Sequence, residues 1–224
     1  MTVITTTLAP DLQVHTLVGE KATSHLVVWH GRSVLIDCHS AQLRDWIAAQ
    51  GLPAPELILH THVQPEHCCE ADQFPAARIL VHAELAELAS DRAGYERAAR
   101  TVWTNPADWP VTMGREKYGV AGCVTEFPPA VPLKLAGTFR EGDRLPWQDL
   151  TFEVIALPGH SRHAVGFVLD SAAIFTGDLL CEHAKLVNVF DLQINYGSTA
   201  LPQLPAVLRA LAARSEEHTS ELQS

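Results

Sequence analysis

Three short motifs constrain this chain more than any other feature, because each places metal-binding side chains directly after an apolar, β-branched run. They are Thr61-His62-Val63-Gln64-Pro65-Glu66-His67, Pro158-Gly159-His160-Ser161 and Phe175-Thr176-Gly177-Asp178. Apolar runs of this length predict strands, and the loops after strand ends let side chains approach one cation from several directions. The sequence therefore predicts one metal site assembled from distant segments.

The remaining pattern is one of short apolar runs separated by Gly and Pro, which predicts strands. The expected strands cover residues 12–17, 25–29, 33–37, 56–60, 78–82, 150–156, 164–169 and 172–176. Helices are expected over 41–49, 83–89 and 201–212, with a further helix starting at Pro65. Strands followed by helices, in an order repeated once, predict an α+β sandwich of two sheets with helices outside.

The three motifs resemble those of the metallo-β-lactamase superfamily. Its first motif runs T-H-x-H-x-D-H, and its later ligands are the His of a P-G-H-[ST] turn and the Asp of a T-G-D turn. This chain departs from the first motif at Gln64, in the second His position, and at Glu66, in the Asp position. The two later motifs match without substitution. The resemblance spans roughly residues 10–200 and implies the αββα sandwich of that superfamily.

The resemblance assigns six metal ligands in this chain: His62, Gln64, Glu66, His67, His160 and Asp178. One metal takes His62, Gln64 and His160. A second takes Glu66, His67 and a further His near the natural carboxyl end, and Asp178 bridges the two. An amide oxygen is a poorer donor than imidazole, and the extra methylene of Glu66 exceeds a distance tolerance of roughly 0.2 Å. One-metal and two-metal sites both stay open, as does a role for Gln64 as a hydrogen bonder to a ligand.

Two residues near the first motif are expected to support it. Asp37 ends the expected strand 33–37 and matches a position where the superfamily carries an Asp that orients the ligands. His60 precedes His62 by two residues on the same strand face, which favours packing or support over ligation.

The resemblance implies a metal-dependent hydrolase in which metal-bound hydroxide attacks a small-molecule ester, thioester or amide. Zn²⁺ is the expected metal, as one or two ions, because an open coordination position lowers the pKa of bound water to roughly 7. Asp178 and Glu66 are the expected catalytic carboxylates, and His163, Asp191 and Tyr196 the substrate-binding candidates. The alternatives are an iron-dependent oxidoreductase of the same fold and a binding protein with a degenerate metal site.

Composition restricts the classes of binding partner and the cellular location that we expect for this protein. A net charge of -10, with 16 scattered Lys and Arg, argues against a nucleic-acid surface. The five Cys form no C-x-x-C pair, which favours reduced thiols. The amino end has no export signal, and no run is long enough to span a bilayer. These features predict a cytoplasmic protein with a small-molecule substrate; they leave the oligomeric state open.

The expected organisation is a single domain over residues 1–213, with an insertion at about 95–132. The insertion is expected to form either a cap over the site or a packing element that does not contact substrate. Residues 214–224 match the translation of a sequencing adapter and are expected to lie outside the natural fold. This predicts a truncated chain that lacks the last ligand of the superfamily, a role that His218 in the tail does not fill.

Overall fold

The computed structural model describes most of the chain, in two compact units. The described residues are 2–19, 22–63, 65–68, 70–91, 133–158, 163–170, 172–181, 185–186 and 204–221. One unit comprises residues 1–98 and 126–140, and the other residues 99–125 and 141–224. Within the described residues, none of the helices has the length and apolar character that a membrane span requires. The insertion expected at 95–132 lies outside the described residues, and the single domain over 1–213 stays a prediction.

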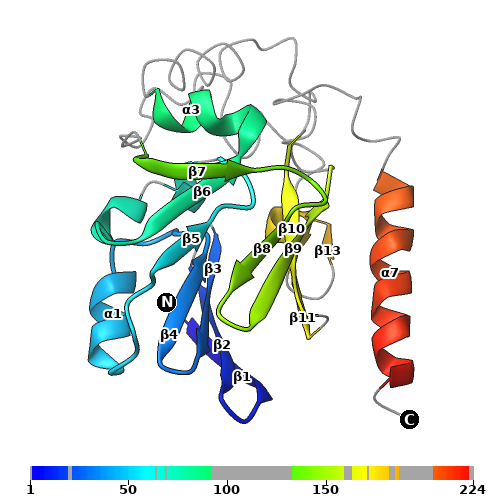
Figure 1. The fold of residues 1–224 in the computed structure, drawn as a ribbon, viewed down its shortest axis with the longest axis horizontal. Coiled ribbons are helices and arrows are strands. Elements are labelled where there is room, and N and C mark those ends of the chain that lie inside the picture. Colours follow the sequence, from blue (N-terminus) through cyan, green and yellow to red (C-terminus); the bar gives the residue numbers. More distant parts are fainter. Residues whose placement is uncertain are drawn as a thin grey trace, which may run out of the picture. The chain divides into compact units, whose positions relative to one another are not determined.

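Within its described residues, the first unit is built on a seven-stranded sheet in the order β1-β2-β3-β4-β5-β6-β7 (Figure 1). The strands are β1 (Thr2–Ala9), β2 (Leu12–Val18), β3 (Thr23–Trp29), β4 (Arg32–Ile36), β5 (Leu57–Leu59), β6 (Arg78–His82) and β7 (Leu135–Phe139). The helices are α1 (Leu43–Ala49), α2 (Pro65–Cys68) and α3 (Ala86–Ser90), with 3-10 turns η1 (Ala71–Gln73) and η2 (Ala83–Leu85). β1 to β4 pair antiparallel, and β4 to β7 pair parallel.

The core of the first unit follows from strand register. Leu26, Leu35, Ile58 and Ile79 are successive cross-strand partners on β3 to β6, so their side chains form a row on one face of the sheet. All four are buried, in one apolar cluster with Ile47 of α1. This row fixes the register of the central strands, because a slip by one residue would turn every apolar side chain to the other face.

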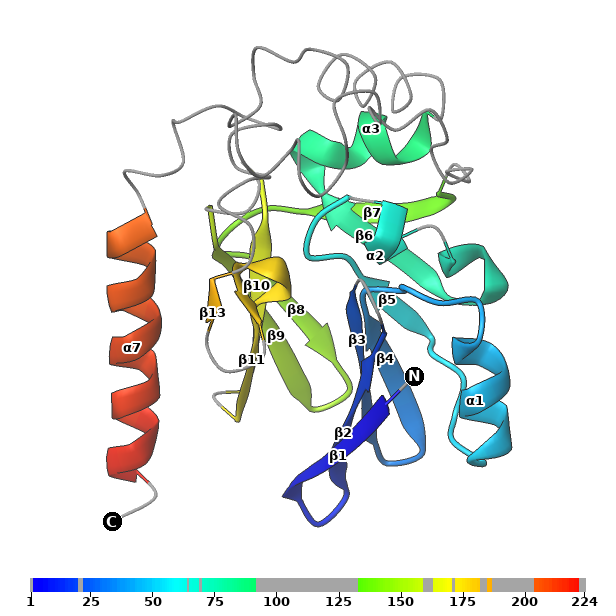
Figure 2. The ribbon, with the colours of Figure 1, turned by 180° about the vertical axis from the view of Figure 1, so that it is seen from behind.

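The central parallel strands bring the first motif to one edge of the sheet. β4 and β5 run in the same direction, with Ile36 beside Leu59, so the residues that follow each strand emerge together. Asp37 comes next after β4 in a left-handed conformation with φ 57°, which Asp tolerates better than most residues. Its N–H donates to the carbonyl of Leu59 at 3.0 Å. The Cys38 N–H donates to the carbonyl of His67 at 2.7 Å and thereby ties α2 to this edge (Figure 2).

Within its described residues, the second unit contains a four-stranded antiparallel sheet in the order β11-β10-β9-β8 and a small β12-β13 pair. Its elements are β8 (Arg144–Trp147), β9 (Leu150–Ala156), β10 (Val165–Leu169), β11 (Ala173–Phe175), η4 (Gly177–Leu179), β12 (Leu180–Cys181), β13 (Lys185–Leu186) and α7 (Leu204–Glu221). Phe152, Val154 and Phe167 are buried on one face of this sheet, with Phe167 opposite Val154. The edge strand β8 adds Trp147, whose ring centroid lies 6.1 Å from that of Phe152.

The expected elements agree with the structure except at several ends and in four omissions. The strand expected over 150–156 is confirmed at both ends. The helix expected over 83–89 is divided between η2 and α3, and the one expected over 201–212 begins at Leu204 and continues to Glu221. α7 therefore includes most of the stretch expected to be a tail. β1, β7, β8 and the β12-β13 pair were not expected from the sequence.

Candidate metal centre

Two of the predicted metal ligands, His62 and His67, lie side by side in the first unit. His62 follows the end of β5, and His67 lies in α2, which begins at Pro65 as predicted. Their ring centroids are 4.2 Å apart at an angle of 49°, and the residues are 2% and 1% exposed. The short α2 turn after a buried strand therefore brings two imidazoles together that are five positions apart in the sequence.

Asp37 is the hydrogen-bond acceptor at the centre of this cluster. Its Oδ1 accepts the backbone N–H of Thr61 at 2.9 Å, and its Oδ2 accepts the Thr61 hydroxyl at 2.7 Å. Oδ2 also lies 3.0 Å from Nδ1 of His67. Burial alone would raise the pKa of Asp37, but the charge and hydrogen bonds of its histidine neighbours outweigh it and hold that pKa well below its usual range. Asp37 is thus a buried carboxylate.

These contacts decide where the protons of both histidines lie. A carboxylate only accepts, so His67 donates from Nδ1 to Asp37, and the Thr61 hydroxyl uses its single proton on Asp37 as well. The Thr61 oxygen can then only accept from Nδ1 of His62, which lies 2.9 Å away. In each neutral ring the remaining lone pair is therefore on Nε2. Asp37 and Thr61 together give both histidines the tautomer that a metal ligand needs.

The donor set of this cluster fits Zn²⁺. Ligand atoms of Asp37, His62 and His67 all lie within 4.8 Å of one another. Both oxygens of Asp37 already accept hydrogen bonds, which favours an orienting role for this carboxylate over direct ligation. Two neutral imidazoles with lone pairs on Nε2 are donors that Zn²⁺ accepts, and a carboxylate that holds the other ring nitrogen is the usual arrangement behind them.

His60 is buried directly beside Asp37. It is 1% exposed, and its Nδ1 lies 3.6 Å from Oδ1 of Asp37, just beyond hydrogen-bonding distance. Within the described part of the chain, neither of its ring nitrogens has a hydrogen-bond partner. It packs beside the carboxylate and is one of the histidines that lower the pKa of Asp37, in line with the expectation that it supports the site.

Two further histidines, His25 and His39, lie near the cluster and were not expected there from the sequence. His25 Nδ1 lies 3.0 Å from the Thr16 hydroxyl, and His39 Nδ1 lies 2.6 Å from the Ser24 hydroxyl. Burial lowers the pKa of each to about 4, against a smaller opposing effect of Asp37. Both are neutral at neutral pH. In the sequence, one feature indicates that a histidine lies near the cluster: His39 follows Asp37 by two residues.

Glycine at position 19 lets the loop before β3 approach His39. A side chain there would place its Cβ 2.5 Å from Cδ2 and 2.6 Å from Nε2 of His39. Both approaches are shorter than real contacts, so the ring occupies the space that any other residue would fill. Gly19 and the His39 ring therefore pack directly against each other, and the ring also contacts Ser24.

The other predicted site residues fall into two groups. Gln64, His160, Asp191 and Tyr196 lie outside the described residues, and of Glu66 the structure describes the backbone in α2. His163 and Asp178 belong to the second unit. The roles of all seven in a shared site stay predictions.

The T-G-D motif forms a tight turn after β11. Gly177 has φ 52°, a left-handed conformation that glycine adopts without strain, and Asp178 follows it in the 3-10 turn η4. Asp178 is half-buried. The loop that carries the P-G-H-S motif is closed at its base by a 3.0 Å hydrogen bond from the Leu157 N–H to the Ala164 carbonyl. Both motifs thus follow strand ends, as predicted.

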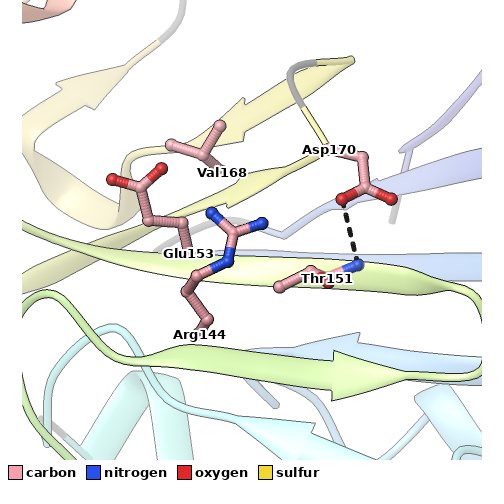
Figure 3. A pocket seen from close by; sticks show the side chains of 5 residues that line it. All are labelled: Arg144, Thr151, Glu153, Val168 and Asp170. Atoms are coloured by element: carbon pink, nitrogen blue, oxygen red, sulfur yellow. Dashed lines mark hydrogen bonds between the residues drawn. The ribbon is translucent and has the colours of Figure 1, made fainter.

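The second unit also has a shallow depression of about 190 Å³ on its sheet, lined by Arg144, Thr151, Glu153, Val168 and Asp170 (Figure 3). Asp170 accepts the Thr151 N–H at 3.1 Å, which stabilises the chain at the end of β10. None of the lining residues belongs to the predicted site. The depression is therefore an ordinary polar surface of the sheet.

Comparison with known proteins identifies the fold. No family model matches the sequence, and no curated protein matches it. Solved structures do: a metallo-β-lactamase with a HARLDQ motif from Cronobacter sakazakii has a TM-score of 0.62 at 20% identity, with 93% of this chain and 73% of that chain covered. FEZ-1 metallo-β-lactamase from Legionella gormanii has a TM-score of 0.59 at 13% identity, with 89% and 72% covered. BJP-1, a subclass B3 metallo-β-lactamase of Bradyrhizobium japonicum, has a TM-score of 0.52 at 13% identity, with 97% and 96% covered.

These likenesses extend over most of the chain, and they show the fold. The chain has the metallo-β-lactamase fold, and the predicted α+β class is confirmed. The HARLDQ motif differs from H-x-H-x-D-H at its third and sixth positions, whereas this chain differs at the third and fifth.

Proposed function

We propose that this chain, which has the metallo-β-lactamase fold, is a metal-dependent hydrolase that acts on an ester, thioester or amide of a small molecule. The observation that carries the proposal is the hydrogen-bond chain from His62 through Thr61 and Asp37 to His67. It gives each buried imidazole, in its neutral form, the tautomer with the lone pair on Nε2 that a metal ligand needs. Ordinary core packing requires no such arrangement.

Each residue of the proposed site would have a distinct role. His62 and His67 hold the metal through Nε2, while Asp37 and Thr61 keep the rings oriented and in one tautomer. When bound, Zn²⁺ would act as a Lewis acid and would lower the pKa of a water molecule that it binds. We retain the ligand and catalytic roles that the resemblance gives to Glu66, His160 and Asp178. Asp178 would orient the attacking water.

The solved structures of this fold support hydrolysis, since those compared above are named metallo-β-lactamases. The bond attacked is left broader than a lactam because one fold hosts many reactions. A small-molecule substrate and a cytoplasmic location complete the proposal. Zn²⁺ is the metal we propose; because imidazole binds zinc and iron alike, the metal content of the purified protein distinguishes the two.

Zinc titration of metal-free protein tests the proposal most directly. His62→Gln and His67→Gln should each weaken Zn²⁺ binding by more than about a hundredfold, because loss of a mere supporting partner already costs roughly 10–100-fold. Thr61→Val should weaken it by about tenfold, and Thr61→Ser, which keeps the hydroxyl, should restore it. His30→Asn is the matched control, because His30 is exposed in the turn between β3 and β4.

Hydrolysis is then measured on a lactam, a thioester and an aryl ester with zinc-loaded protein. Turnover of at least one substrate that disappears in His62→Gln and persists in His30→Asn supports the proposal. Zinc binding that is unchanged in His62→Gln and His67→Gln contradicts it. Purified protein that contains iron and transfers electrons, without hydrolysis, favours the oxidoreductase instead.

A further inference from the structure

The strand β1 is an open edge of the first unit's sheet. It stands at one end of the strand order and pairs with β2 on one side (Figures 1 and 2). Thr2 and the stretch 4–7 are exposed. Within the described residues, no backbone hydrogen bond joins β1 to anything other than its β2 ladder. The N–H and C=O groups on its outer side therefore form a template for another strand.

The side chains of this edge favour pairing. β1 has the sequence TVITTTLA, with six β-branched residues and no charge, Pro or Gly. Among the described residues, Ile4 is the one large apolar side chain that is exposed, at 55%. An edge that resists pairing usually carries charges, Pro or a bulge along its length. In β1 the one such feature is a register shift between Thr7 and Ala9, next to the hairpin turn. The strand from Thr2 to Thr7 keeps a regular β conformation.

Charge also favours this surface as a contact between identical chains. The chain carries a net charge of -10, but no charged side chain occurs before Asp11. β2, the neighbouring strand, has no Asp, Glu, Lys or Arg either. Two copies can therefore approach through β1 without the electrostatic repulsion that the acidic parts of the surface would impose.

We propose that two copies of this chain associate by antiparallel pairing of β1 with β1, with Ile4 opposite Ile4 of the second copy, which joins their sheets across a two-fold axis. The antiparallel direction follows from Asp11, which lies in the turn beside β1. Parallel pairing would place the two Asp11 carboxylates next to each other. Antiparallel pairing separates them by about 20 Å or more, the length of six strand residues, which exceeds a screening length of about 8 Å. The two-fold also lets each strand present the same surface to its partner.

The association should be weak and reversible. Six residues per strand bury far less area than the roughly 1,200–2,000 Å² of stable interfaces. The dimer should therefore form at high protein concentration, with a dissociation constant of about 10–500 μM by our reckoning from this interface class. The proposal is independent of the metal centre.

Sedimentation velocity over a concentration series from about 5 to 500 μM tests it, since that series brackets the expected association. Wild-type protein should shift from monomer to dimer, and Ile4→Lys should weaken dimerisation at least tenfold because two like charges would meet across the strands. Ala48→Lys adds the same charge at an exposed position of α1 and should leave dimerisation unchanged. Circular dichroism confirms that each variant is folded.

A charge-swapped mixture tests the homotypic contact itself. Ile4→Lys and Ile4→Glu should each be monomeric alone, and an equimolar mixture should recover the dimer because opposite charges then meet. Wild-type protein that stays monomeric at the highest concentration overturns the proposal. So does dimerisation that survives Ile4→Lys, dimerisation that Ala48→Lys weakens equally, or a mixture that fails to recover the dimer.

Discussion

β4 and β1 are strands of one sheet with similar local chemistry and opposite surroundings. Both are rich in apolar and β-branched residues. β4 lies between β3 and β5, residues 33–36 are buried, and the chain leaves it at Asp37. β1 has one neighbour and exposes most of its side chains.

The difference lies in position within the sheet, which composition does not encode. A strand between two others has both rows of backbone groups paired and its side chains covered. Its end is consequently rigid enough to hold Asp37 within hydrogen-bond distance of Thr61 and His67. A strand at the end of the sheet keeps one row of polar groups available to a partner. One type of strand sequence thus supports a candidate metal centre in one place and a candidate contact surface in another.

The largest effect should come from the carboxylate at the end of β4. Asp37→Ala removes the acceptor of three donors in a buried cluster and should lower the free energy of unfolding by about 3–5 kcal/mol. Urea unfolding of metal-free protein measures this. Asp170→Ala is the control, since Asp170 also has positive φ, is exposed and accepts one hydrogen bond, from Thr151. It should lose about 1 kcal/mol. Equal losses would show that backbone conformation, and not the buried cluster, determines the cost.

A second effect concerns pH and compares histidines beside the two strands. His25 pairs with Ile36 of β4, and burial lowers its pKa to about 4 from 6.5. Because the folded pKa lies below the unfolded one, its stabilising contribution is present above pH 6.5 and is lost as the pH falls toward 4. Between pH 7 and 5 this should cost about 2 kcal/mol at most.

His25→Gln, in metal-free protein, should remove that part of the pH dependence. His15, which is opposite Thr5 of β1, also has its pKa lowered by burial, and His15→Gln supplies the comparison at the edge. We expect the unfolding free energy of His15→Gln to keep more of the wild-type pH dependence between pH 7 and 5 than that of His25→Gln does. An unchanged slope in His25→Gln would contradict the assignment.

The smallest effect should be at the exposed edge. Ile4→Thr should change the unfolding free energy by less than about 0.5 kcal/mol, as exposed substitutions usually do. Val34→Thr places a hydroxyl at a fully buried position of β4 and should cost about 1–2 kcal/mol. Thermal unfolding of both variants at low protein concentration gives the comparison. A larger loss of unfolding free energy in Ile4→Thr than in Val34→Thr would contradict the description of β1 as the exposed strand and β4 as the buried one.

Much of the local structure was predictable because it depends on near neighbours. A short apolar run indicated the β9 strand over 150–156, and Pro65 indicated the start of α2. Asp37 and His60 were expected beside His62, and the structure places Asp37 within the cluster. β1 was missed although its run of Thr, Val and Ile has high strand propensity.

Of the two histidines near the cluster, His39 lies two residues after Asp37, but His25 was not predictable. His25 lies 12 positions before Asp37 and in no motif, and it comes near only because β3 pairs with β4. The Asp37 contacts span 24 residues to Thr61 and 30 to His67. No local pattern encodes such distances.

By itself, the sequence determined where most of the strands lie, and the order of its three motifs indicated the fold that the solved structures show. The tertiary structure decided which side chains share protons and which strand remains at an edge. The physical reason is that propensity and alternation act over a few residues, whereas the tautomers of His62 and His67 depend on pairing between β4 and β5. That pairing forms only when the whole sheet does.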